Sequence, residues 1–285
     1  MKSVLVTGAY GQLGKALKRA VEGLDGLRFY FTDVDTLDIC DKTQLERYFN
    51  VHAIDIVVNC AAYTAVDKAE DDAETCRRVN CDAVRNIGEA AAKVGAKVIH
   101  ISTDYVFDGQ GSRPYREDDP INPTSAYGKS KAEGEKALQD VCSDTIIVRT
   151  AWLYSETGNN FVNTMLRLAR ERVKIGVVCD QRGTPTYAGD LAAAIVKILV
   201  AQHFAPGIYH YTNAGECTWY DFACKIFNIT GIDGNVSPIT TSEYYTRAAR
   251  PAYSVLDKTK IRETYNVEIP AWEESLAKCL GNITK

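Results

Sequence analysis

The sequence lacks several features that would place the chain outside the ordinary globular class. Among its 285 residues there is no long run of Lys or Arg, and no apolar stretch approaches 18 residues. These absences exclude a transmembrane helix and, because a reader of phosphate backbones carries a basic stripe, a nucleic-acid partner. The first residues resemble a strand rather than a signal peptide, so we expect a cytoplasmic protein without membrane contact.

Metal ligands and disulfide patterns are also scarce. The four His share no ligand spacing with the nine Cys, and no CxxC pair occurs. Structural zinc needs clustered Cys and His, and an odd number of Cys does not make a disulfide framework. Most of the Cys lie in apolar runs, which is typical of small buried residues in a reducing compartment. We therefore expect no metal and no disulfide.

Short β-branched runs alternate with longer amphipathic stretches through the first half of the chain. The expected strands are 4–7, 28–32, 54–60, 97–102 and 145–150. The expected helices are 11–22, 42–51, 71–94 and 125–138. This alternation predicts an α/β fold built on a Rossmann-type, doubly wound parallel sheet.

After residue 151 the alternation becomes less regular. Helices are expected at 161–171, 188–200, 219–227 and 272–280, with strands at 174–179 and 207–211. We predict a dinucleotide-binding domain of residues 1–151 plus about 174–212. A smaller α/β substrate-binding lobe would take about 152–173 plus 213–285, with no clean linker between the two.

A glycine-rich turn follows the first expected strand directly and precedes a helix. Its spacing is GxxGxxG, in which glycines provide a tight turn, room for a pyrophosphate and close packing of helix on strand. Free N–H groups at the helix start would then meet the phosphate charge. We predict dinucleotide binding, rather than a turn that binds nothing, by Gly8, Tyr10, Gly11, Gln12, Leu13 and Gly14.

Carboxylates follow the second expected strand. One of them would bond the adenosine ribose and repel a 2′-phosphate. Asp33 is the better candidate because it comes first after the apolar run, and Asp35 is its competitor. No Arg or Lys stands beside them in the sequence, which favours NADH. Asp38 and Ile39 could face the adenine ring.

Tyr127 and Lys131 stand four residues apart at the start of an expected helix, so both side chains share one face. They follow a strand that ends in Ser102 and Thr103, at the sheet edge where ligands lie. An ammonium at Lys131 would favour the phenolate and lower the pKa of Tyr127. Tyr127 could then protonate a carbonyl oxygen that Thr103 holds, while hydride reaches the carbon. The alternative is a solvated surface pair.

These residues resemble the extended short-chain dehydrogenase/reductase family. Within it, three stretches are similar to the dTDP-4-dehydrorhamnose reductase family, and a fourth fits it. They are NCAAYTAVDKAE (59–70), STDYVFDG (102–109), RTAWLY (149–154) and DQRGTPT (180–186). The resemblance covers nearly the whole chain.

The resemblance implies the remaining site residues. Cys60 ends its strand where the nicotinamide should lie, without doing chemistry itself. The expected cofactor contacts in this half are Cys60, Ala61, Ala62, Tyr63, Thr64, Ser102, Tyr127 and Lys131. The expected sugar contacts are Val66, Thr103, Asp104, Tyr105, Tyr127 and Trp152. A Trp at a strand end is more often part of the core, which is the alternative for Trp152.

The implied activity is reduction of the C4 keto group of dTDP-4-dehydro-6-deoxy-L-mannose to dTDP-L-rhamnose, a step towards cell-surface polysaccharide. Members of the family use NADPH, NADH or both. Some dimerise through Mg²⁺ on an acidic residue just after the last glycine, where this chain has Lys15 and Ala16. We therefore expect a monomer or a metal-independent homodimer.

Three other functions deserve comparison. A 4,6-dehydratase would place Glu after the Thr-Asp pair, where this chain has Tyr105. A 4-epimerase is Ser-rich before Val-Tyr-Gly, which does not match. A non-catalytic regulatory subunit of the methionine adenosyltransferase β type stays open, although Tyr127 and Lys131 are intact. Candidate diphosphate partners are Arg167, Arg170, Arg172, Arg182, Arg247 and Arg250.

Overall fold

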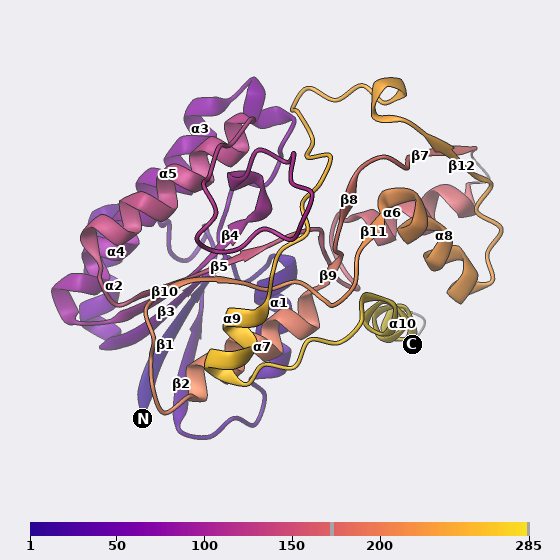
Figure 1. The fold of residues 1–285 in the computed structure, drawn as a ribbon. Coiled ribbons are helices and arrows are strands. Elements are labelled where there is room, and N and C mark those ends of the chain that lie inside the picture. The colour runs from indigo at the N-terminus through magenta and orange to yellow at the C-terminus, as the bar shows by residue number, and fades with distance from the viewer. Residues whose placement is uncertain (172–173, 284–285) are drawn as a thin grey trace.

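A six-stranded sheet with every neighbouring pair parallel forms the centre of the protein, in the order β10-β5-β4-β3-β1-β2 (Figure 1). The computed structural model describes residues 1–171 and 174–283. The strands are β1 (Lys2–Thr7), β2 (Leu27–Phe31), β3 (Ile54–Asn59), β4 (Lys97–Thr103), β5 (Thr145–Thr150) and β10 (Gly207–His210). This is the parallel sheet that the alternating pattern predicts.

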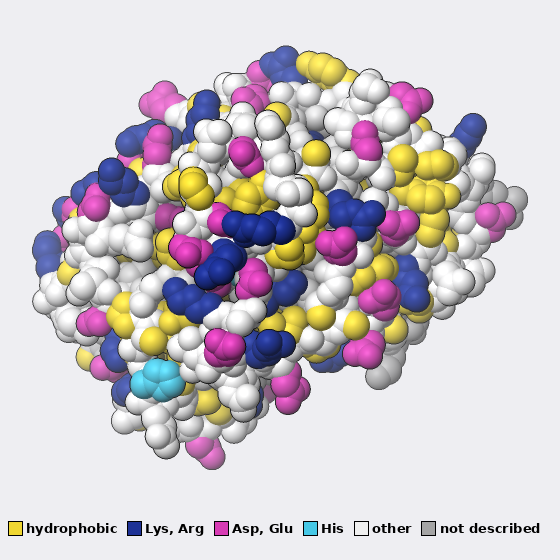
Figure 2. Space-filling view, viewed as in Figure 1, with side chains coloured by type: hydrophobic (Ala, Val, Ile, Leu, Met, Phe, Trp, Pro, Cys, Tyr) yellow, Lys and Arg dark blue, Asp and Glu magenta, His cyan; other side chains and the backbone are white. Residues whose placement is uncertain are grey.

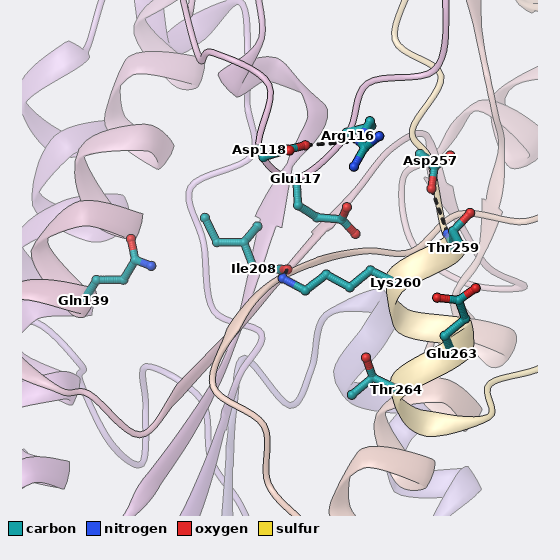
Figure 3. A pocket seen from close by; sticks show the side chains of 10 residues that line it. All are labelled: Arg116, Glu117, Asp118, Gln139, Ile208, Asp257, Thr259, Lys260, Glu263 and Thr264. Carbon is teal, nitrogen blue, oxygen red and sulfur yellow. Dashed lines mark hydrogen bonds and ion pairs between the residues drawn. The ribbon is translucent and has the colours of Figure 1, made fainter.

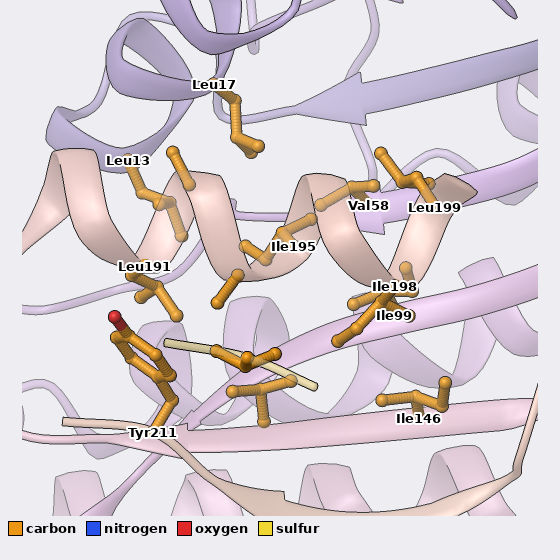
Figure 4. Packing of buried hydrophobic residues seen from close by; sticks show 14 of the residues in the cluster. Leu13, Leu17, Val58, Ile99, Ile146, Leu191, Ile195, Ile198, Leu199 and Tyr211 are labelled. Atoms are coloured by element: carbon orange, nitrogen blue, oxygen red, sulfur yellow. The ribbon is translucent and has the colours of Figure 1, made fainter. Parts of the chain in front are cut away.

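Helices cover both faces of the sheet, which explains why its strands are apolar on both sides. One face carries α1 (Gln12–Ala20) and α7 (Ala188–Val200), and the other α2 (Lys42–His52), α4 (Ala83–Val94) and α5 (Ala126–Val141). Leu13 of α1 and Ile195 of α7 pack with Val58 and Ile146 of the sheet (Figure 4). All four side chains are at most 4% exposed.

The strand order reverses between β1 and β3. From β1 the chain passes to one side to form β2 and then returns to the other side of β1 to form β3. In doubly wound sheets ligands bind at the carboxyl ends of the strands beside such a reversal. The glycine turn that follows β1 is therefore placed at this switch point.

The segment 71–94, expected as one helix, is broken in the structure. It contains α3 (Ala73–Arg77), a π-helical turn η2 (Arg78–Asp82) and then α4, preceded by the 3₁₀ turn η1 (Lys68–Glu70). The buried Asn80 side chain accounts for the irregularity. Its amide accepts a hydrogen bond from the backbone N–H of Tyr63 and donates one to the carbonyl oxygen of Tyr63. Such π turns frequently occur at functional sites.

A second lobe lies to the right in Figure 1. Its helices are α6 (Phe161–Arg170), α8 (Trp219–Thr230) and α10 (Trp272–Ile283). Its strands form the pairs β6 (Leu153–Tyr154) with β9 (Thr186–Tyr187), β8 (Arg182–Gly183) with β11 (Cys217–Thr218), and β7 (Ile175–Val178) with β12 (Val236–Ile239). Phe222 and Leu276 are among the fully buried residues of its separate core.

Four elements depart from the predicted division of the chain; two of them, β8 and β9, were assigned to the dinucleotide-binding part but pair with strands of the second lobe. Strand β7, assigned to the dinucleotide-binding part, instead pairs with β12 and buries Ile175 in the second core. Helix α9 (Thr259–Tyr265), assigned to the smaller lobe, buries Ile261 and Tyr265 against the main sheet. For β7 and α9, apolar side chains are buried against the nearer core. The predicted boundary at residue 173 lies outside the described residues.

Two surface properties bear on the expected partners. Within residues 1–171 and 174–283, no helix is both long and apolar enough to cross a membrane. On the face seen in Figure 2, Lys and Arg side chains alternate with Asp and Glu. That face therefore carries no continuous basic stripe of the kind that binds nucleic acid.

Candidate active site

Two cavities meet at the carboxyl edge of the sheet and share Gly8, Gly11, Cys60 and Ala62 in their walls. The first, about 350 Å³, extends from the glycine turn past Asp33 towards the loop after β2. The second, about 530 Å³, extends from the turn to Tyr127 and the second lobe. Together they form one elongated hollow across the switch point.

Glycine is required at two places in the turn. Gly8 has a φ of +65°, and a Cβ there would lie 2.6 Å from the backbone nitrogen of Ala61. A Cβ on Gly14 would lie 2.3 Å from the carbonyl oxygen of Gly8. Gly11 caps α1 without a side chain, so the N–H groups of the first helical turn can meet an anion. These residues fit the pyrophosphate of a dinucleotide.

The smaller cavity contains the predicted adenosine contacts Asp33, Asp38 and Ile39. The Asp33 carboxylate accepts the backbone N–H groups of Tyr10 and Val34 and so is fixed beside the glycine turn. The sequence showed no cation beside these carboxylates, but the folded chain brings one to the same cavity. Arg78, on the π turn 45 residues beyond Asp33, also lines this cavity.

The predicted catalytic residues lie together in the larger cavity. Ser125 caps α5 by accepting the N–H of Gly128, which sets Tyr127 in the first turn of that helix. Tyr127 and Lys131 face the end of β4, and Thr103, the last residue of β4, shares the cavity with them. Burial raises the pKa of Tyr127 well above its usual range, and a hydrogen bond with Thr103 opposes that rise. Tyr127 is therefore a protonated hydroxyl, as a proton donor must be.

The expected effect of Lys131 on Tyr127 is not what the structure shows. Lys131 is 1% exposed, and burial lowers its own pKa to about 8. Its Nζ donates to the carbonyl oxygen of Ile101 at 2.6 Å. Lys131 is not among the groups that shift the pKa of Tyr127. The prediction of a lowered Tyr127 pKa is thus wrong for this ligand-free structure, because burial dominates.

Asp104 follows Thr103 at the same strand end and lines the larger cavity. Burial raises the pKa of its carboxyl to about 6, although the carboxylate accepts a hydrogen bond from the Thr103 hydroxyl at 3.0 Å. A carboxyl that ionises near neutrality can exchange a proton or accept a sugar hydroxyl. Asp104 is therefore a candidate for a pH-sensitive group of the site.

An aromatic platform forms the side of the cavity that faces the second lobe. Trp152 stacks on Trp219 with ring centroids 3.5 Å apart, and Phe161 packs against Trp219 at 4.7 Å. Trp152 has a φ of +48°, which an L side chain rarely adopts. Backbone strain of this kind clusters at functional sites. The indole both lines the cavity and packs against the second core.

A segment of the second lobe returns to the catalytic edge. Arg250 pairs with Asp67 at 2.5 Å and donates to the Tyr105 hydroxyl at 3.3 Å, and Arg247 pairs with Asp71. The Tyr105 ring packs edge-on against Tyr127, with centroids 5.5 Å apart. Among the candidate diphosphate partners, Arg250 thus contacts a residue of the larger cavity, whereas Arg172 lies outside the described residues.

Nearly every residue predicted from the sequence lines one of the two cavities, and Tyr63 is the exception. The Tyr63 ring packs against a small cluster of Ala69, Cys76 and Tyr127. It therefore lies beside the predicted catalytic tyrosine and does not line a cavity. The other lining residues were not predicted as site residues. Some of them lie beside the predicted motifs, and the rest come from segments that no local pattern marks. They are Thr7, Lys15, Val34, Leu37, Cys40, Arg78, Val79, Ile101, Thr150, Ala151, Leu153, Thr157, Gly158 and Asn159.

A further cavity of about 660 Å³ lies between β10, α9 and the loop before α5 (Figure 3). Two of its charged side chains already have partners: Arg116 pairs with Asp118, and Lys260 donates to the carbonyl oxygen of Ile208. None of the predicted site residues lines it. Its size therefore does not make it the active site.

The doubly wound sheet, the glycine turn and the Thr, Tyr and Lys side chains at one edge define an NAD(P)-binding oxidoreductase of the short-chain dehydrogenase/reductase type. The family model described as "RmlD substrate binding domain" matches residues 1–285, and the chain belongs to that family. The predicted family and fold class are thus confirmed.

Curated relatives and a solved structure are similar over their whole length. The chain is 41% identical to the spore coat polysaccharide biosynthesis protein SpsK of Bacillus subtilis, over 98% of this chain and 97% of that one. It is 41% identical to a dTDP-4-dehydrorhamnose reductase of Aggregatibacter actinomycetemcomitans, covering 97% of each. The crystal structure of a dTDP-4-dehydrorhamnose reductase from Bacillus anthracis in complex with NADP superposes with a TM-score of 0.95 at 40% identity, covering 99% of this chain and all of that one.

Proposed function

We propose that this chain reduces the C4 keto group of dTDP-4-dehydro-6-deoxy-L-mannose to dTDP-L-rhamnose, with NADPH or NADH as the hydride donor. The observation that carries the proposal is the set of Thr103, Tyr127 and Lys131 in one cavity with the glycine turn. The names of the reductase relatives supply the substrate. These relatives do not favour the alternative of a non-catalytic regulatory subunit.

The roles of the side chains follow from their positions. When bound, the dinucleotide supplies the hydride for C4. Tyr127 donates its hydroxyl proton to the keto oxygen, and Thr103 holds that oxygen by a hydrogen bond. Asp104, Tyr105, Val66 and the Trp152 platform surround the sugar, and Lys131 contacts the nicotinamide ribose. The two cavities would hold the cofactor, and Asp33, Asp38 and Ile39 would bind its adenosine end.

The test is an assay with the dTDP-keto-sugar as substrate, in which the absorbance of NADPH or NADH reports its oxidation. Tyr127→Phe should lower kcat at least about 10²-fold, the size of a lost general acid, while the affinity for NADPH changes little. Tyr48→Phe, on α2 and away from the cavities, is the matched control and should keep full activity. Full activity of Tyr127→Phe would overturn the assignment.

One relative widens the choice of keto-sugar. A probable dTDP-4,6-dihydroxy-2-methyloxan-3-one 4-ketoreductase of Streptomyces antibioticus is also 41% identical over 98% of this chain. Comparing kcat/KM for the two keto-sugars decides between them, and we expect the rhamnose precursor to be preferred.

We also propose that the enzyme is cytoplasmic, works as a monomer or metal-independent homodimer, and has a dinucleotide-binding domain with a smaller substrate lobe. Lys15 follows the last glycine and lines the cavity, where a carboxylate would be needed to hold Mg²⁺. Light scattering after chromatography with Mg²⁺ and with a chelator should give the same mass. A mass that halves on chelation contradicts this.

A further inference from the structure

A line of buried polar side chains leads from the end of β1 to Lys131, and the proposed function uses only Lys131 of its members. It comprises Thr7, Asn59, His100 and Lys131, each at most 1% exposed. The Thr7 hydroxyl lies 2.6 Å from Asn59 Oδ1, Asn59 Nδ2 lies 3.0 Å from His100 Nδ1, and His100 Nε2 lies 3.3 Å from Lys131 Nζ. Since these groups have no water to bond, their donors and acceptors must match.

The orientation of the Asn59 amide is fixed by a backbone group. The N–H of Ala61, which can only donate, points at the atom assigned as Asn59 Oδ1 at 3.2 Å. That atom must be the oxygen, since an amide nitrogen could not accept the bond. The amide nitrogen of Asn59 therefore faces His100 and donates to its Nδ1.

This donation determines the protonation of His100. A ring nitrogen that accepts a hydrogen bond carries no proton, so the proton of the neutral imidazole is on Nε2. An imidazolium would set an N–H of the ring against the N–H of Asn59. Complete burial agrees with this, since it lowers the pKa of His100 well below its usual value.

The Nε2–H of His100 points at Lys131 Nζ, which already donates to the carbonyl oxygen of Ile101. An ammonium has no lone pair with which to accept that hydrogen, whereas a neutral amine has one. We propose that His100 is a positioning residue, which donates its Nε2–H to Lys131 and so favours the uncharged amine of that side chain over its ammonium in the free enzyme. The relevance of this to catalysis rests on the proposed function.

The groups that face Lys131 are compatible with an amine. They are Glu135 from α5, His100 from β4, Cys60 after β3 and Cys76 from α3. Glu135 is the one carboxylate among them. Its charge is already matched by Arg149 at 2.7 Å, and it accepts the Ser102 hydroxyl at 2.5 Å. Burial raises the pKa of the Cys60 thiol to about 12, so it brings no anion.

The direct test is nitrogen NMR of ligand-free, full-length protein labelled at its four His. Two-bond ¹H–¹⁵N correlations show which ring nitrogen carries the proton, and the signals lost in His100→Gln assign the residue. We expect the Nε2–H form of His100, unchanged from pH 6 to 9. An Nδ1–H form or an imidazolium in this range would overturn the proposal. Since no substrate is present, the result does not depend on the proposed function.

A second test reverses the direction of the hydrogen bonds at His100. Asn59→Asp places a carboxylate against Nδ1, which then carries the proton, and Nε2 can accept from a Lys131 ammonium. We expect the NMR spectrum to switch to Nδ1–H and the alkaline limb of kcat/KM, which reports the free enzyme, to move upwards by at least one pH unit relative to the wild type. His203→Gln, at an exposed site, should move neither. A residue with a merely structural role would lower kcat/KM by the same factor at every pH, and that outcome would contradict the proposal.

Discussion

Replacing Asp104 by Asn should stabilise the protein, although it removes a group of the active site. Asp104 is 3% exposed, and burial raises the pKa of its carboxyl from 3.8 to about 6. Below pH 3.8 the carboxyl is protonated in both the folded and the unfolded protein. As pH rises towards 6, the unfolded chain releases this proton first, so the folded state is progressively destabilised relative to a neutral side chain.

The size of the effect follows from the two pKa values. At about 1.4 kcal/mol per pH unit, the interval from 3.8 to about 6 corresponds to about 3 kcal/mol once the carboxyl is ionised in both states. The full gain of Asp104→Asn is expected at pH 7.5, and roughly half of it at pH 5.0. The amide oxygen of Asn can still accept the hydrogen bond from Thr103, so the packing is retained.

The assay is urea unfolding of ligand-free wild type and variant at both pH values, with equal m values as the condition for comparing free energies of unfolding. Asp118→Asn, whose side chain is 76% exposed, is the control and should change stability by less than about 0.5 kcal/mol. In turnover, kcat/KM of the wild type should fall below about pH 6, and that of Asp104→Asn should not. A stability difference that is the same at both pH values would refute the reasoning.

Two further predictions concern the turn and the core. Gly8→Ala should weaken NADPH binding at least tenfold in a fluorescence titration, because its Cβ would lie 2.6 Å from the Ala61 nitrogen; unchanged affinity would contradict the cofactor assignment. Glu135→Gln should lower the free energy of unfolding in urea by about 3–5 kcal/mol, since it leaves the buried Arg149 without its carboxylate. Arg167→Gln breaks an exposed pair and should cost less than about 0.5 kcal/mol, and a similar loss in both variants would argue against burial as the cause.

The main sheet and the glycine turn could be predicted because their signals are local. Apolar β-branched runs mark β1, β3 and β5, and the spacing of the three glycines marks the turn. Elements in the second half of the chain gave weaker signals. Residues of β12 are at best half-buried, so its run has no apolar stripe, and α9 has only seven residues. Both are ordered by contacts with distant elements, which single-sequence patterns do not reveal.

The candidate site shows the same limit in its chemistry. The sequence placed Tyr127 and Lys131 correctly on one helix face, since that depends only on their spacing. The direction of the Tyr127 pKa shift depends on burial by residues from other elements, and it was predicted wrongly. Arg78 was overlooked beside Asp38 because a π turn, set by the bonds of Asn80 with Tyr63, brings it there.

The ion pair between Arg250 and Asp67 has a consequence for how the enzyme is made. The two residues are 183 positions apart, and the pair lies against the Tyr105 hydroxyl. Synthesis proceeds from the N-terminus, and folding begins with the part already made. The sheet has all its strands once residue 210 has left the ribosome. The catalytic edge acquires its last neighbour only some forty residues later. A growing chain can thus hold a dinucleotide pocket before it has a finished sugar pocket.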